Sequence, residues 1–183
     1  MTRNIRYSEK AIGIFQVAWG ALTLFVAIYG LKIFCEMGVT YFQLRLEEVS
    51  FWKILKTYHY EFLIAILSLI SGVLFILNKK AGWQLAIITS IVTAINSAIN
   101  LIYFYDRPDK LFLNKTTTIL LGATIILVFF LISFILLSKP FRIKYSPTGK
   151  IWWAIILIAG LLLVDSLIIA CGFIFEIINL NFS

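Results

Sequence analysis

The carboxylate of Asp165 lies near the middle of a long apolar stretch of the chain. The stretch from Ile151 to Ile178 is long enough to cross a bilayer as a helix. Asp165 comes 14 residues after its start, which is roughly 21 Å along a helix and therefore near the bilayer centre or somewhat beyond it. Because an ionisable side chain is costly inside hydrocarbon, its presence here predicts a functional polar site.

Polar residues of three other apolar stretches fall at a similar depth. The same count of 14 residues, made from the same side of the membrane, reaches Asn96 and Thr124 and comes close to Thr23. Asn100 lies one helical turn further out. The sequence therefore predicts one polar layer formed by Asp165, Asn96, Asn100, Thr124 and Thr23.

Three interpretations of this layer are open. In the first, Asp165 binds a cation or relays a proton, with the amides of Asn96 and Asn100 as partners, and burial raises its pKa. In the second, Asp165 is protonated or hydrogen-bonded to Asn96, and the layer only joins helices. In the third, it faces an aqueous vestibule or an interface between subunits.

The composition of the chain is that of a membrane protein. Of its 183 residues, 61% are hydrophobic, 16% are aromatic and only 14% are charged, so the apolar share exceeds that of soluble domains. We predict an all-α, polytopic transmembrane bundle of five, possibly four, spans with short loops, forming a single membrane domain over residues 1–183. The predicted spans are residues 11–33, 60–77, 83–105, 117–138 and 151–178.

The connections between the spans differ in length. Residues 34–59 mix charged residues with apolar ones at helical spacing, which predicts an outer loop with an interfacial helix. An extension of the second span into water is nearly as well supported. Residues 78–82 read as a tight polar turn, so the second and third spans are expected to be antiparallel neighbours.

Small and polar residues recur at three- and four-residue steps on several spans. In lipid, small faces let helix backbones approach closely, and polar stripes must face other helices or water. Gln16 lies on such a face of the first span, and Thr89 and Ser90 lie along the polar stripe of the third. The predicted helix-packing residues are Gly20, Ala27, Ser71, Gly72, Thr93 and Gly172.

The basic residues predict an orientation. Residues 1–10, the turn at Lys79 and the linker 139–150 fall on one side and hold nine Lys and Arg against Glu9 alone, whereas the other side holds seven against seven acids. Short Lys/Arg-rich segments stay in the cytoplasm, so we expect a cytoplasmic N-terminus and an outer C-terminus. The tryptophans expected in the inner aromatic belt are Trp83, Trp152 and Trp153. The basic surplus then contacts anionic lipids at the cytoplasmic face, and no nucleic acid is expected as a partner.

Residues that carry catalysis are scarce. The chain has two cysteines and one histidine, His59, and no nucleotide-binding loop, zinc-protease motif or nucleophile elbow. We therefore predict no enzyme, no catalytic residue, no cofactor and no metal, with His59 as a polar anchor at the outer interface.

The sequence supports three hypotheses for the function of the protein. The leading hypothesis is a non-enzymatic assembly or accessory module of the bacterial inner membrane, acting as a homo-oligomer or as a subunit of a membrane complex. One alternative is a small ion or proton channel or transporter that uses the site around Asp165. The other is a membrane effector or sensor of a bacterial defence system.

Overall fold

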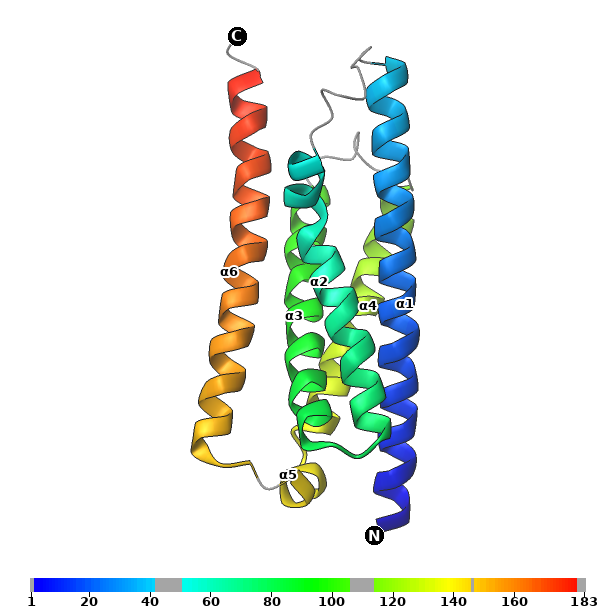
Figure 1. The fold of residues 1–183 in the computed structure, drawn as a ribbon, viewed down its shortest axis with the longest axis vertical. Helices are drawn as coiled ribbons and strands as arrows, with labels where there is room; N and C mark the ends of the chain where they lie inside the picture. The colour runs from blue at the N-terminus through cyan, green and yellow to red at the C-terminus, as the bar shows by residue number, and fades with distance from the viewer. Residues whose placement is uncertain (1, 42–50, 106–113, 146, 181–183) are drawn as a thin grey trace.

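The computed structural model describes an all-helical chain. It covers residues 2–41, 51–105, 114–145 and 147–180, with side chains described for residues 5–32, 59–102, 114–145 and 147–165. The helices are α1 Thr2–Tyr41, α2 Phe51–Ile76, α3 Lys80–Tyr105, α4 Lys115–Leu136, α5 Lys139–Tyr145 and α6 Gly149–Leu180. In Figure 1, α1, α3 and α6 run in one direction and α2 and α4 in the other.

Four helices in the described part of the chain are long and apolar enough to cross a bilayer. Their spans are Ile5–Lys32, His59–Ile76, Lys80–Ile102 and Lys115–Leu136. The short helix α5 and the following residues Gly149–Asp165 of α6 qualify together as a fifth span, bent by 111°. The predicted fold class, a polytopic all-α bundle with four or five spans, is confirmed.

Two segments depart from the predicted loops. α1 continues to Tyr41 and α2 begins at Phe51, so the described residues between 34 and 59 extend these helices, in agreement with the alternative of an extended second span. Continuing a helix avoids the cost of nucleating another. The linker 139–150 contains α5. Pro140 is compatible with this helix because it falls in the first turn, where the missing N–H breaks no helical hydrogen bond.

The helix α2 ends in a tight turn that contains Asn78. This residue has a φ of 57°, the left-handed conformation that Asn tolerates at helix ends. The Lys79 N–H donates to the Leu74 carbonyl at 2.9 Å and the Asn78 N–H to the Phe75 carbonyl at 2.9 Å, which satisfies the last carbonyls of α2. As predicted, α2 and α3 are antiparallel neighbours joined by a tight turn.

Glycines bring α1 and α2 into backbone contact. A Cβ placed on Gly72 would lie 2.5 Å from the Gly13 carbonyl oxygen, and one on Gly20 would lie 2.8 Å from the Ala65 carbonyl oxygen. Any side chain at these positions would push the two helices apart. The absence of side chains at these glycines therefore lets the backbones of α1 and α2 approach closely.

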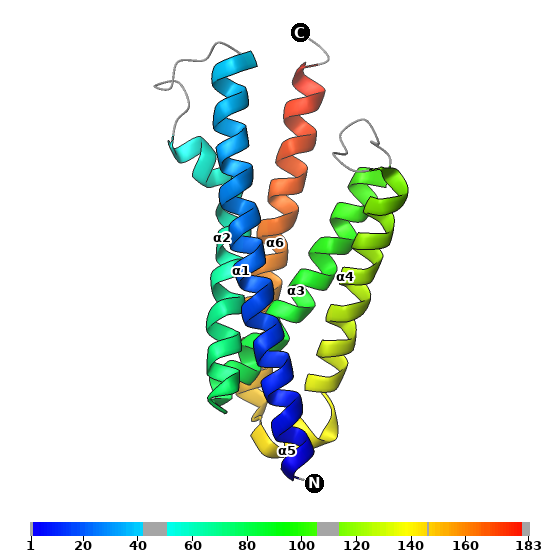
Figure 2. The ribbon, with the colours of Figure 1, turned by 90° about the vertical axis from the view of Figure 1, so that its right-hand side faces the viewer.

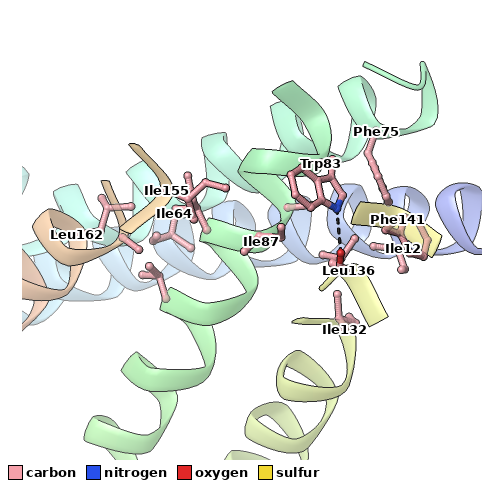
Figure 3. Packing of buried hydrophobic residues seen from close by; sticks show 14 of the residues in the cluster. Ile12, Ile64, Phe75, Trp83, Ile87, Ile132, Leu136, Phe141, Ile155 and Leu162 are labelled. Atoms are coloured by element: carbon pink, nitrogen blue, oxygen red, sulfur yellow. Dashed lines mark hydrogen bonds between the residues drawn. The ribbon is translucent and has the colours of Figure 1, made fainter. Parts of the chain in front are cut away.

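Aromatic side chains join α1 to α4 and close one end of the bundle. On α4, Phe129 contacts the rings of Phe15 and Trp19 of α1, with centroids 5.5 and 5.0 Å apart. Trp83 is fully buried, and its indole N–H donates to the Leu136 carbonyl at 3.0 Å (Figure 3). That carbonyl belongs to the last turn of α4 and has no partner within its own helix.

The short helix α5 is held under the bundle by its aromatic residues. Tyr145 stacks on Trp83 with ring centroids 5.6 Å apart, and Phe141 packs on Phe75 at 6.1 Å. Trp152, at the start of α6, meets Trp83 edge-on at 5.9 Å. Trp83 is thus a core residue at the meeting point of α3, α4, α5 and α6 and not a member of an interfacial belt, whereas Trp153 is 74% exposed.

The outer surface of the spans is apolar. On α6, Ile155, Ala159 and Leu162 are buried at helical spacing and form the face that packs inward. Most of the remaining apolar residues of its described part face outward. In Figure 2 the α1–α2 and α3–α4 pairs diverge away from the end that carries the N-terminus. The exposed apolar side chains include Leu22, Phe25, Val26, Leu120, Leu127, Phe130, Leu131, Phe134, Leu157 and Leu161.

Candidate functional site

Asp165 pairs with His59, a residue of α2. Its Oδ2 lies 2.9 Å from the imidazole Nε2, within hydrogen-bond distance, and both side chains are 35% exposed. The pair joins two helices that are distant in sequence. An imidazole and a carboxylate at this distance can share and exchange a proton, which a single carboxylate among apolar side chains cannot do.

The position of His59 sets the level of this pair. His59 comes 17 residues before Ile76, the last residue of α2, roughly 26 Å from the α2–α3 turn at the rise of an α-helix. Because the hydrocarbon core of a bilayer is about 30 Å thick, a turn at one interface puts the His59–Asp165 pair close to the other. The count of residues along α6 placed Asp165 near the bilayer centre or somewhat beyond it. The contact with His59 agrees with the position beyond the centre.

A third ionisable group lies beside the pair. Glu61 is half-buried two residues after His59, close enough to His59 and Asp165 for their charges to act on it. Its Oε2 is buried and has no hydrogen-bond partner among the described residues. Within the part of the chain that has described side chains, no three His, Cys, Asp or Glu are placed to hold a metal ion.

The other residues of the predicted polar layer are spread over the bundle. Thr23 belongs to α1 and Thr124 to α4, and in Figure 1 both helices lie on the far side of α2 and α3 from α6. The Thr124 hydroxyl donates to the Leu120 carbonyl of its own helix at 2.7 Å. Asn96 and Asn100 are on α3, the main neighbour of α6, where Asn96 is half-buried and Asn100 is exposed. Equal depth alone does not bring Thr23 and Thr124 to Asp165.

A second polar site lies in the middle of the bundle, between α1 and α3. Gln16 is fully buried, and its Nε2 donates to Ser90 Oγ at 2.9 Å. Thr89 Oγ1 lies 3.3 Å from Gln16 Oε1 and 2.9 Å from the Leu85 carbonyl. Ser90 comes ten residues after Lys80, roughly 15 Å along α3, which places these bonds near mid-membrane. They fasten α1 to α3.

The predicted helix-packing residues can be placed individually. Gly20, Ala27, Ser71, Gly72 and Thr93 are buried. The Ser71 hydroxyl donates to the Gly82 carbonyl at 3.5 Å, across the α2–α3 contact. The surroundings of Gly172 lie outside the described residues.

A third polar site is centred on Glu9 at the opposite end from His59. Glu9 is 1% exposed, and Lys144 Nζ donates to its two carboxylate oxygens at 2.5 and 2.6 Å. The Tyr145 hydroxyl donates to Glu9 Oε1 at 2.7 Å, and Lys144 also donates to Asn78 Oδ1 at 2.9 Å. These contacts join α1, α5 and the α2–α3 turn, and we call them the Glu9 junction.

The Glu9 junction surrounds a buried carboxylate with hydrogen-bond donors. Glu9 accepts from Lys144 Nζ at both oxygens and from the Tyr145 hydroxyl at Oε1. With Lys144 supplying the compensating charge, the buried carboxylate is fully paired.

Sequence reasoning did not find either ion pair. Glu9 is the sole acid among the nine basic residues of its side of the chain, and that imbalance was the available signal for a buried ion pair. His59 was predicted to be a polar anchor at the outer interface, and that role stays a prediction. Its partner needed the packing of α2 against α6.

Comparisons with protein-family models, with curated proteins and with solved structures give no match to this chain. Its multi-spanning helical membrane architecture therefore stands on the sequence and the fold.

Proposed function

We propose that the protein is a non-enzymatic membrane module of a cell inner membrane, which assembles with itself or with a larger membrane complex. The observation that carries this proposal is the use of the buried polar groups. Gln16, Thr89 and Ser90 bond to one another, and Ser71 and Ser133 donate to helix carbonyls. Polar residues used in this way hold helices together and do not line a continuous hydrated path.

The outer faces of α4 and α6 supply the surface for assembly. Phe130, Leu131 and Phe134 of α4 and Leu157 and Leu161 of α6 are all more than half exposed. Apolar faces of this kind pack equally well against lipid tails or against an apolar helix of another subunit. Assembly then depends on shape and close packing rather than on charge.

The number of copies in a lipid environment tests this proposal. The full-length protein, extracted with its native lipids into nanodiscs, is expected to contain more than one copy or a companion protein at fixed stoichiometry. Mass photometry and denaturing gels of the same sample measure both. A single copy without a companion contradicts the assembly role.

We also propose that the basic end of the bundle faces the cytoplasm. The N-terminal residues of α1, the α2–α3 turn, α5 and the start of α6 lie at one end in Figure 1. These segments carry the nine basic residues whose retention defines the inner side. The orientation requires no change of fold.

A second candidate function, proton transfer, is favoured by the His59–Asp165 pair. The two groups lie 2.9 Å apart and are each one-third exposed, and Glu61 lies beside them. Ionisable groups that pair with one another within transmembrane helices mark proton relays in many transport proteins. A bundle of four or five helices would perform such transfer as part of an oligomer.

Proton flux into proteoliposomes tests this second candidate. A pH-sensitive dye inside the vesicles should report flux with the native protein and none with Asp165→Asn or His59→Gln. Thr124→Val should retain native flux, because its hydroxyl is bonded within α4. Absence of flux with the native protein, or native flux with Asp165→Asn, contradicts the proton role and leaves the assembly role standing.

A further inference from the structure

The Glu9 junction brings cations of three chain segments to one place. Lys144 of α5 binds Glu9 of α1 and Asn78 of the α2–α3 turn. Each of these partners has a basic neighbour: Lys10 follows Glu9, and Lys79 follows Asn78. Consecutive Cα atoms are about 3.8 Å apart, so the junction fixes the backbones that carry these cations.

α5 adds a further cation beside the same junction. Arg142 lies two residues before Lys144, and Arg142, Lys10 and Lys79 are all exposed. They form what we call the basic collar. Its members come from α1, α5 and the α2–α3 turn, the three segments that the Glu9 junction joins.

The chain supplies one acid at this end to balance these charges. Glu9 is the only Asp or Glu within residues 1–10, 78–82 and 139–150, and its carboxylate is already bound to Lys144 and Tyr145. The positive charge of the basic collar is therefore left for an anion from outside the chain.

Exposed apolar side chains identify the kind of anion. Ile143 of α5 is 64% exposed, Trp153 at the start of α6 is 74% exposed, and Tyr7 of α1 is 62% exposed. They belong to the same end of the bundle as the collar. A soluble anion offers nothing to these side chains, whereas a phospholipid offers both a phosphate and acyl chains.

We propose that the basic collar binds the headgroups of anionic phospholipids, with Ile143, Trp153 and Tyr7 among the adjoining acyl chains. α5 is then an interfacial helix that the Glu9 junction holds at headgroup level. The inference names a lipid partner for the proposed membrane module and does not depend on its oligomeric state. It applies to whichever leaflet this end occupies.

Native mass spectrometry of the full-length protein with added lipid tests the collar. Phosphatidylglycerol is expected to bind more tightly than phosphatidylcholine. The variant Lys79→Gln/Arg142→Gln should lose about 25-fold in affinity for phosphatidylglycerol, about fivefold for each cation removed. The matched variant Lys32→Gln/Lys115→Gln removes two exposed cations from the opposite end and should bind phosphatidylglycerol as the native protein does.

Three results would overturn the proposal. Equal affinity for the two lipids would show that charge does not select the ligand. Equal loss in both double variants would assign the effect to net charge instead of to the collar. Displacement of phosphatidylglycerol by inorganic phosphate would identify a soluble anion as the ligand. Circular dichroism of both variants verifies that the helices are retained, so that each result decides.

Discussion

The two ends of the bundle treat a carboxylate in different ways. Glu9 of α1 is 1% exposed and accepts hydrogen bonds from Lys144 and Tyr145, which both belong to α5. Asp165 is one-third exposed and is joined to His59 of α2, which is exposed to the same extent. The first carboxylate is buried between a cation and a phenol, whereas the second is in a pair that water can reach.

This difference distinguishes two halves of the bundle. We call the half that contains the Glu9 junction the fixed half and the half that contains the His59–Asp165 pair the adjustable half. The fixed half contains the Glu9 junction, the Gly13–Gly72 backbone contact and the aromatic residues around Trp83. The adjustable half begins where the helix pairs diverge in Figure 2, and there the His59–Asp165 pair joins α2 to α6.

Removing the buried acid should have the largest effect. Glu9→Ala leaves Lys144 without its counter-charge and Tyr145 without its acceptor. We expect a loss of about 3 kcal/mol in the free energy of unfolding, the lower limit for a broken buried ion pair, because Lys144 is about one-third exposed. Reversible unfolding in mixed micelles measures the loss.

A double variant provides the control for the ion pair. Glu9→Gln/Lys144→Met removes both charges together, so no uncompensated charge remains at the junction, and much of the lost stability should return. If the double variant is as unstable as Glu9→Ala, the loss of stability does not come from an uncompensated charge, and packing accounts for the stability of the fixed half.

A side chain at the backbone contact should have the next largest effect. Gly72→Val places its Cβ against the Gly13 carbonyl, and overpacking of this kind costs about 1–3 kcal/mol. Gly160→Val is the matched control, because a Cβ at Gly160 meets nothing within 4 Å. Equal stability of the two variants in the same unfolding experiment would refute close α1–α2 packing.

The exposed acid should contribute least to stability. For Asp165→Asn we expect a loss of about 0.6 kcal/mol, the average for a hydrogen bond between membrane helices, since the amide can still pair with His59. A loss as large as that of Glu9→Ala would remove the contrast between the two halves and make the His59–Asp165 pair a second fixed contact.

The sequence predicted the elements of the fold well. Long apolar stretches gave the spans, and the polar segment 78–82 gave the α2–α3 turn, because the hydrocarbon thickness sets the length of a span and a short turn leaves antiparallel packing. It did not predict α5. Seven residues with a proline read as a linker until Phe141 and Tyr145 are placed against Phe75 and Trp83.

The candidate sites were predicted less completely, for a geometric reason. Counting residues gives depth along a helix but not the angular position of one helix relative to another. Thr23 and Thr124 were predicted at the depth of Asp165, and a shared depth does not say which helices are in contact. Long-range pairs such as His59 with Asp165 require the order of helices around the bundle.

The proposed orientation places the basic end of this membrane-embedded bundle in the cytoplasm. The most direct test is labelling of single cysteines by a membrane-impermeant thiol reagent, in a protein whose Cys35 and Cys171 are replaced by serine. Thr116→Cys lies exposed at the start of α4, and Thr148→Cys lies exposed between α5 and α6 at the basic end. In intact cells, or spheroplasts where an outer membrane is present, we expect labelling at position 116 and labelling at position 148 only after permeabilisation. The reverse pattern, or equal labelling of both positions without permeabilisation, would contradict the account.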